Sequence, residues 1–314
     1  MVIEISLIAL ALVVLFFGAE GLVRGSAALA LKAGLSPLMV GLTVVAFGTS
    51  APELVVSIES ALAGQGDIAV GNVVGSNSFN IGIILGLTAL ICPIPVHLQV
   101  LRLDAPLALG VAVLVPLLLL DASIGRLEGA GLLAGIVAYT LWNVWQARRS
   151  TDAAALGDSD LPGAGQHAAL SVALLIGGLL LLVLGSRLLV SNAVSLAQIL
   201  GVSDAVIGLT IIAAGTSMPE VATSVVAAIR RQPDIAIGNV IGSNVFNVLG
   251  ILGIASLLAP LEASGVSALD HAFMVGFSLL LLPLLYTGRL LHRVEGAVLL
   301  AGYGAYLWLL WPAG

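Results

Sequence analysis

The chain has little of the charge that a water-soluble protein carries on its surface. Only 9% of its 314 residues are charged, whereas 60% are hydrophobic. A soluble fold of this length needs a more polar surface, and a disordered chain needs a much lower hydrophobic content. The composition therefore excludes both classes and indicates a protein that is solvated by the lipid bilayer.

Cysteine and basic residues are also scarce. Cys92 is the single cysteine, which excludes an intrachain disulfide and a thiolate metal site. The 11 basic residues are fewer than the 17 acidic ones and are scattered along the chain, which excludes a nucleic-acid partner. No protein partner is indicated either.

Long apolar stretches fill most of the chain. About 20 apolar residues cross the hydrocarbon core, and each stretch is a candidate membrane helix. The first carries Glu4 where a signal peptide needs a basic residue, so we expect it to be retained. The ten stretches are residues 3–30, 36–62, 68–91, 104–120, 126–147, 169–198, 204–229, 234–258, 268–287 and 291–311.

The distribution of basic residues predicts the orientation of these helices. Short cytoplasmic connections are enriched in Lys and Arg. One side of the membrane receives only Arg126, and the other receives eight basic residues: Lys32, Arg102, Arg148, Arg149, Arg230, Arg231, Arg289 and Arg293. We therefore expect a multi-pass protein of the plasma (inner) membrane, with a cytoplasmic linker at residues 148–168 and both termini outside the cytoplasm.

An internal repeat is the strongest signal in the sequence. Residues 41–86 align without a gap on residues 208–253, with 26 identities in 46 positions and an offset of 167 residues. Five predicted spans fit within that offset, so the second copy enters the membrane from the opposite side. The expected fold is all-α, with ten transmembrane helices in two inverted five-helix repeats, residues 1–147 and 169–314. Such repeats typically form a substrate site near the midplane.

Each copy contains the motif GTSxPE in its first helix. Proline removes a backbone donor, so we expect the helix to break at GTS, with Ser or Thr capping the segment that follows. The break leaves carbonyl groups available to a cation. The acidic residues of the two motifs are Glu53 and Glu220.

The second helix of each copy carries a polar stripe and starts near an aspartate. The spacing i, i+4, i+8 places three polar side chains on one helix face. We expect Asp67 and Asp234 to cap these helices. The stripes consist of Asn72, Ser76 and Asn80 in one copy and Asn239, Ser243 and Asn247 in the other.

Neither copy has a basic residue at the depth of the glutamates. Two buried carboxylates then need protons or bound cations as their counter-charge. The available ligands are all oxygen atoms, which favour a hard cation such as Ca²⁺ or Na⁺ over zinc or copper.

The paired GTSxPE and GNxxGSNxFN motifs closely resemble the sodium/calcium exchanger superfamily and its two α-repeats. The resemblance implies alternating access, in which Ca²⁺ moves against Na⁺ through overlapping sites, with no cofactor and the ions as transported ligands. It also implies a ligand set, namely Glu53, Glu220, the carbonyls of Thr49, Thr216, Ala46 and Ala213, and oxygens of Ser50, Ser217, Ser76, Ser243, Asn80 and Asn247. Related exchangers often carry Asp where this chain has Asn80 and Asn247.

Other functions remain to be compared with Na⁺/Ca²⁺ exchange. A Ca²⁺/H⁺ antiporter would use the same glutamates as proton carriers, and a passive cation channel would also use a polar pathway. A hydrolase with Ser50 or Ser217 as nucleophile lacks a base, so we do not expect an enzyme. Glu20 is expected to pair with Arg24 on its own helix, or with Arg187 as a contact between the first and sixth spans.

Overall fold

Nearly all of the chain that the computed structural model describes is helical. The described residues are 1–33, 35–149, 167–200 and 213–310. Most of the predicted linker and the first part of the seventh predicted span, residues 204–212, lie outside them. The all-α expectation is met apart from four strands of two residues each.

The first half of the chain contains α1 (Val2–Ala33), α2 (Pro37–Val40), η1 (Gly41–Val45), α3 (Ala46–Thr49), α4 (Ala51–Leu62), α5 (Gly66–Phe79), η2 (Asn80–Leu85), α6 (Gly86–Ile91), β1 (Ile94–Pro95), η3 (Val100–Asp104), α7 (Ala105–Leu118), η4 (Leu119–Asp121), β2 (Ser123–Ile124) and α8 (Arg126–Arg149). The second half contains α9 (Ala168–Ile199), α11 (Ala213–Thr216), α12 (Met218–Ile229), α13 (Pro233–Phe246), η7 (Asn247–Leu252), α14 (Gly253–Leu258), β3 (Leu261–Glu262), α15 (Ala268–Tyr286), β4 (Leu290–Leu291) and α16 (Arg293–Leu310). The segments η1, η2, η3 and η7 are π-helical, and η4 is a 3₁₀ turn.

Seven described helices are long and apolar enough to cross a membrane. The bent pair formed by residues 37–49 and α4 makes an eighth candidate span, with a bend of 45°. The remaining predicted spans correspond to α12, which is shorter, and to α16, which is not among the seven. The chain is thus a multi-pass membrane protein.

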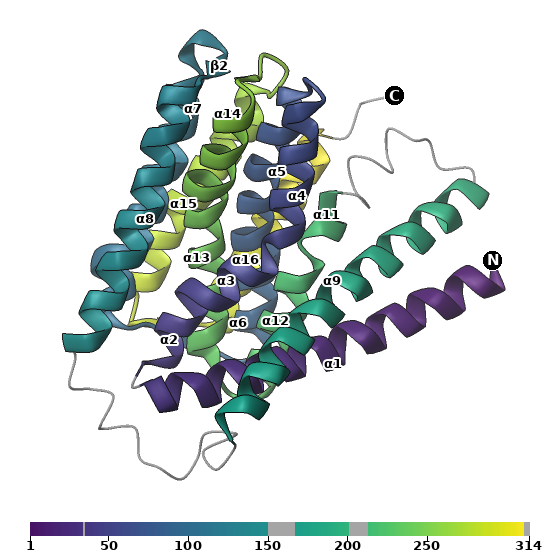
Figure 1. Ribbon diagram of the computed structural model, residues 1–314, viewed down its shortest axis with the longest axis vertical. Coiled ribbons are helices and arrows are strands. Elements are labelled where there is room, and N and C mark those ends of the chain that lie inside the picture. The colour runs from purple at the N-terminus through teal and green to yellow at the C-terminus, as the bar shows by residue number, and fades with distance from the viewer. Residues whose placement is uncertain (34, 150–166, 201–212, 311–314) are drawn as a thin grey trace.

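The long helices α1 and α9 lie side by side and slope across the other helices (Figure 1). Glycines let their backbones come very close. A Cβ atom at Gly178 would lie 2.5 Å from the backbone nitrogen of Leu22, and one at Gly25 would lie 2.7 Å from that of Leu175. Any larger side chain along this contact would force the two helices apart.

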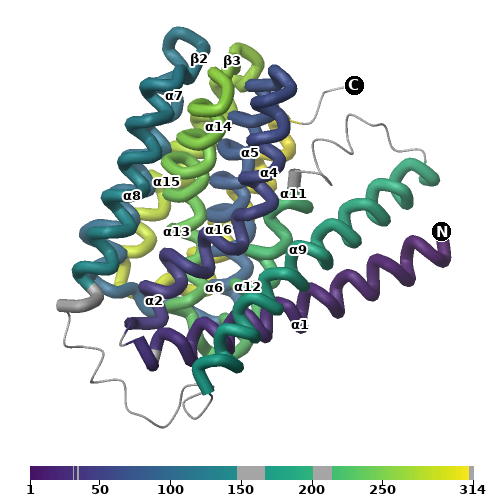
Figure 2. Tube along the Cα trace, in the orientation of Figure 1, coloured from purple at the N-terminus to yellow at the C-terminus, as the bar shows by residue number. Residues whose placement is uncertain are grey.

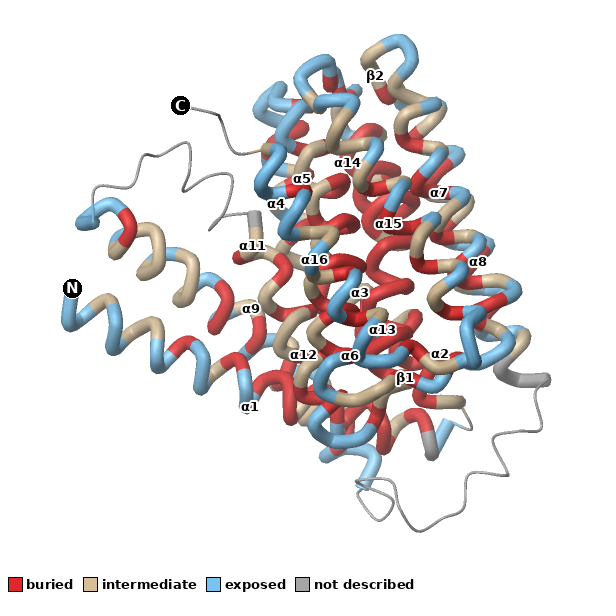
Figure 3. The backbone as a smooth tube through the Cα atoms, turned by 180° about the vertical axis from the view of Figure 1, so that it is seen from behind, coloured by how far each residue is buried: buried red, intermediate tan, exposed pale blue. Residues whose placement is uncertain are grey.

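The core of the molecule lies between α5 and α13 with their π-helical continuations. In Pro233–Leu258, 83% of the residues in the apolar stretch are buried, whereas the share in Val2–Ala30 is 22%. Figure 3 shows the same gradient, with buried segments along α13 and exposed segments along α1. The helices that carry the polar stripes are therefore the innermost ones.

The short strands join the two halves of the chain. β1 pairs with β4, and β2 pairs with β3, both antiparallel. Ile94 lies opposite Leu291, and Ile124 lies opposite Leu261. The two pairs are related by the repeat offset of 167 residues, since residue 94 corresponds to 261 and residue 124 to 291. The tube in Figure 2 shows β2 and β3 together at one end of the bundle.

Candidate functional site

Both GTSxPE segments interrupt a helix. Ser50 separates α3 from α4 with φ −79° and ψ 11°, and Ser217 separates α11 from α12 with φ −86° and ψ 8°. A proline follows in the first turn of each new helix, where its missing N–H needs no partner. The predicted helix break is therefore present in both copies.

Ser50 and Ser217 occupy the N-cap positions of α4 and α12, as predicted, but their side chains do not act as caps. Neither side chain makes a capping hydrogen bond. Instead, the hydroxyl of Ser50 donates to Oε1 of Glu220 at 2.9 Å, and that of Ser217 donates to Oε1 of Glu53 at 2.8 Å. Each serine thus contacts the glutamate of the other half, and the two broken helices meet at one place.

The two glutamates are almost completely enclosed. Glu53 and Glu220 are each 1% exposed. Among the described residues, the ion pairs lie elsewhere; Glu20, for example, pairs with Arg24 at 2.5 Å and with Arg230 at 2.6 Å. The expected local pair with Arg24 is therefore confirmed. The alternative contact between Glu20 and Arg187 is not formed within the described chain.

Four buried side-chain oxygen atoms of the predicted ligands have no hydrogen-bond donor within the described chain. They are Oε2 of Glu53, Oε2 of Glu220, Oδ1 of Asn80 and Oδ1 of Asn247. Buried polar atoms are normally hydrogen-bonded, so four unpaired acceptors in two equivalent pairs require an explanation. A cation that coordinates oxygen supplies one, because Ca²⁺ takes carboxylate and amide oxygens together.

The other polar residues of the stripes support this geometry. Asn72 donates to the carbonyl of Glu53 at 3.1 Å, and Asn239 donates to that of Glu220 at 3.5 Å. These amides link the second helix of each copy to the first. The hydroxyl oxygens of Ser76 and Ser217 lie 3.3 Å apart, so Ser76 neighbours the hydroxyl that donates to Glu53.

The remaining predicted ligands lie around the helix breaks. The hydroxyl of Thr49 donates to Oδ1 of Asn239 at 3.0 Å, and the hydroxyl of Thr216 contacts Glu53. The carbonyl of Ala46 already accepts from the Ser50 amide at 3.1 Å and from the Ser243 hydroxyl at 3.4 Å. Ala213 begins α11, which places its carbonyl one turn before the second break.

Asp67 and Asp234 do not cap their helices, contrary to prediction. The N-cap positions belong to Gln65 and Gln232, without a side-chain capping bond. Asp67 accepts from the backbone amide of Gly265 at 2.7 Å, and Asp234 bonds to Nε2 of His97 at 3.0 Å. Both aspartates therefore connect one half of the chain to a loop of the other.

Sequence reasoning missed one feature of the site. The π-helical turns η2 and η7 begin at Asn80 and Asn247, and such turns often occur at functional sites. The roles that the sequence allows for Asn77 and Asn244 are support of the ligands and hydrogen bonds between helices. The structure shows the second role, since each of them bonds to the other half.

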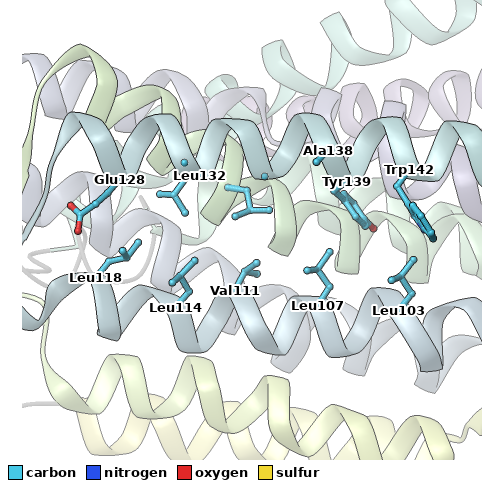
Figure 4. A pocket seen from close by; sticks show the side chains of 13 residues that line it. Leu103, Leu107, Val111, Leu114, Leu118, Glu128, Leu132, Ala138, Tyr139 and Trp142 are labelled. Carbon is cyan, nitrogen blue, oxygen red and sulfur yellow. The ribbon is translucent and has the colours of Figure 1, made fainter.

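The apolar pocket between α7 and α8 has different chemistry. It has a volume of about 730 Å³, and apolar residues such as Leu107 and Leu114 form most of its wall (Figure 4). Glu128 and Tyr139 are its few polar residues. Because a hard cation needs several oxygen ligands, this pocket is not the cation site.

Comparison with known proteins identifies the family of the chain. A family model described as sodium/calcium exchanger protein matches residues 3–145 and 170–311. CaxA of Alkalimonas amylolytica, described as a candidate antiporter, is 40% identical over 309 residues, which cover 96% of this chain and 97% of CaxA. The inner membrane protein YrbG of Escherichia coli K12 is 37% identical over 98% of this chain and 96% of its own length.

A solved structure shares the whole fold. The sodium-calcium exchanger NCX_Mj, soaked with zero Na⁺ and Ca²⁺, superposes with a TM-score of 0.84 and 32% identity over 99% of this chain and 100% of that one. Sequence and fold thus agree over nearly the full length. The chain belongs to the sodium/calcium exchanger family, whose members are membrane antiporters of Ca²⁺ and other cations and not enzymes.

Proposed function

We propose that this protein exchanges Na⁺ for Ca²⁺ by alternating access at a site built on Glu53 and Glu220. The observation that carries the proposal is the group of four unpaired, buried oxygen atoms contributed equally by the two halves. A passive arrangement of polar residues would satisfy these atoms internally, because an unpaired buried acceptor costs free energy. A transported cation satisfies them only while it is bound.

The proposed ligands fit a hard cation that can also leave the site. Among the described residues, no three His, Cys, Asp and Glu side chains gather at one place. The site must therefore use amide, hydroxyl and carbonyl oxygens beside its two carboxylates, a set that suits Ca²⁺ and Na⁺. The proposed set is Glu53, Glu220, Ser50, Ser217, Ser76, Ser243, Asn80 and Asn247 with the carbonyls of Thr49, Thr216, Ala46 and Ala213.

The charge of the site favours an electrogenic exchange. Glu53 and Glu220 give the site a formal charge of −2, since positions 80 and 247 carry neutral amides. One Ca²⁺ brings this charge to zero, whereas three Na⁺ bring it to +1. We propose an exchange of three Na⁺ for one Ca²⁺, which moves one net positive charge in each cycle.

The architecture that we propose consists of ten transmembrane helices in two inverted repeats, residues 1–147 and 169–314. The internal repeat, the offset of 167 residues and the equivalent strand pairs support it. The excess of Lys and Arg on one side supports a cytoplasmic linker at residues 148–168 and termini outside the cytoplasm. The resemblance to YrbG, an inner membrane protein, supports the plasma membrane as its location.

Proteoliposomes test both the coupling ion and the stoichiometry. We expect Ca²⁺ uptake into vesicles loaded with Na⁺, together with a current whose sign follows the movement of Na⁺. Uptake driven only by an imposed H⁺ gradient would instead identify a Ca²⁺/H⁺ antiporter that uses the same glutamates. Saturable counterflow distinguishes a carrier from a channel, and zero net current would contradict the proposed stoichiometry.

A further inference from the structure

Four asparagines from the second helices of the two repeats form a hydrogen-bonded network across the two halves. Asn247 Nδ2 donates to Asn77 Oδ1 at 3.0 Å, and Asn80 Nδ2 donates to Asn244 Oδ1 at 2.9 Å. Asn77 Nδ2 donates to the backbone carbonyl of Asn244 at 3.2 Å, and Asn244 Nδ2 donates to that of Asn77 at 3.3 Å. All four side chains belong to residues that are at most 2% exposed.

Two backbone carbonyls determine which way each side-chain amide of the network is oriented. A side-chain amide can turn over and exchange its oxygen for its NH₂ group, but a backbone carbonyl only accepts. The carbonyl of Asn244 therefore requires the NH₂ group of Asn77, which turns Oδ1 of Asn77 toward Asn247. That oxygen in turn requires the NH₂ group of Asn247, so Oδ1 of Asn247 is left without a donor.

The same sequence of contacts occurs in the other half. The carbonyl of Asn77 requires the NH₂ group of Asn244, and Oδ1 of Asn244 requires the NH₂ group of Asn80. Oδ1 of Asn80 is then the unpaired atom. Two fixed carbonyls thus determine the orientation of four amides, and both chains of contacts end at an oxygen that is counted among the proposed cation ligands.

We infer that Asn77 and Asn244 are positioning residues that hold Asn247 and Asn80 with the oxygen facing the transported cation. This inference rests on the proposed function. Without the anchor, an amide can present its NH₂ group, whose partial positive charge opposes a cation. The network thus holds Asn80 and Asn247, whose amides could each take two orientations, in the orientation that offers oxygen to the cation.

The network also selects an amide over a carboxylate at positions 80 and 247. An ionised Asp at position 247 has no N–H for Oδ1 of Asn77, so two acceptors would face each other in a buried place. The same holds for position 80 and Asn244. Asn80 and Asn247 therefore fit this network, and as neutral amides they leave the formal charge of the site at −2, the charge on which the proposed stoichiometry depends.

A double-mutant cycle tests whether Asn77 acts through Asn247. The variants are Asn77→Leu, Asn247→Ala and the combination of both, and the readout is the Kd for Ca²⁺, obtained from the dependence of Tm of the purified protein on Ca²⁺ concentration. We expect Asn77→Leu to raise this Kd about tenfold in the wild-type background, which corresponds to about 1.4 kcal/mol. In the Asn247→Ala background, where the ligand is already missing, we expect a change below about twofold, since the two effects are then not additive.

A merely structural role of Asn77 would give the same penalty in both backgrounds and would overturn the inference. Unchanged Ca²⁺ dependence of Asn77→Leu would overturn it as well. The equivalent cycle of Asn244→Leu with Asn80→Ala repeats the test if Asn77→Leu does not fold. Asn192→Leu is the matched control, because the bonds of Asn192 to described residues stay within α9, to the carbonyl of Leu188 at 2.7 Å and the hydroxyl of Ser191.

The same measurements separate this inference from the function on which it rests. If Ca²⁺ and Na⁺ leave the Tm of the wild-type protein unchanged, the proposed function fails and the inference fails with it. If wild type responds to Ca²⁺ and the cycle is additive, only the positioning role of Asn77 is wrong.

Discussion

Replacement of Glu53 by Gln removes one charge from the site and changes almost nothing else. The side chain is 1% exposed, and its Oε1 accepts from Ser217 at 2.8 Å while its Oε2 has no donor within the described chain. Glutamine has the same shape and can still accept from Ser217. Its NH₂ group, however, occupies the position of the unpaired oxygen, so a donor replaces an acceptor beside the cation.

The expected loss of Ca²⁺ affinity follows from the burial of the pair. The formal charge of the site falls from −2 to −1, and the bound Ca²⁺ keeps an uncompensated positive charge in an enclosed place. Removal of one partner from a buried ion pair costs about 3–5 kcal/mol. At about 1.4 kcal/mol per factor of ten, Kd for Ca²⁺ should rise by roughly two to nearly four orders of magnitude.

Isothermal titration of the purified protein with Ca²⁺ measures this change, and Ca²⁺ uptake by proteoliposomes measures its effect on transport. Glu59→Gln is the matched control, since Glu59 lies on the same helix α4, six residues after Glu53, and is exposed. We expect Glu59→Gln to bind Ca²⁺ like wild type. If folded Glu53→Gln also binds Ca²⁺ within about threefold of wild type, the charge argument is refuted.

Three further changes test other parts of the structure. Ser217→Ala removes the hydrogen bond to the carboxylate of Glu53. Because a hydrogen bond to a charged group contributes about 1.5–3 kcal/mol, isothermal titration should show at least about tenfold weaker Ca²⁺ binding. Unchanged Ca²⁺ binding would contradict the contact between Ser217 and Glu53. Gly178→Val pushes α1 away from α9, because even a Cβ atom would lie 2.5 Å from a backbone nitrogen of α1. Overpacking of this kind costs about 1–3 kcal/mol, so Tm should fall by several degrees. An unchanged Tm would refute the close approach of the two helices. The hydrogen bond to Asp234 raises the pKa of His97 above 6.5, so this contact stabilises the fold fully below pH 6.5, and its contribution is lost as pH rises through the raised pKa. The Tm of wild type should therefore decline toward that of His97→Gln as pH rises from 6.5 through that pKa. Parallel plots of Tm against pH for the two proteins would exclude a stabilising contact between His97 and Asp234.

The broken helices and the acidic pair could be predicted because their physical causes are local. Pro52 and Pro219 cannot continue a regular helix, and a buried glutamate without a basic residue at its depth needs an external counter-charge. The repeat then predicts that two such segments meet. The contacts Ser50 to Glu220 and Ser217 to Glu53 show the result in the structure.

The partners of several polar residues could not be predicted, because they depend on which segments pack together. Ser50 and Asp67 follow the local rules for helix caps, yet each bonds to a residue of the other half. The hydroxyl of Ser50 donates to a buried carboxylate of the other half and is oriented toward it, and hydrogen bonds to charged groups are the stronger ones. Local capping rules do not include such long-range partners.

The orientation of the amides was also beyond the sequence. Asn77 and Asn80 are recognisable as one polar face, but the sequence does not say which oxygen stays unpaired. That outcome depends on the backbone carbonyl of Asn244, 167 residues away from Asn77. Helix packing alone brings it within hydrogen-bonding distance.

A crystal soaked with Ca²⁺ and measured by anomalous diffraction tests the central claim most directly. The account predicts an anomalous peak between the carboxylates of Glu53 and Glu220, about 2.3–2.6 Å from their oxygens and from Oδ1 of Asn80 or Asn247. A bound Ca²⁺ at any other place, with no peak between Glu53 and Glu220, would contradict it.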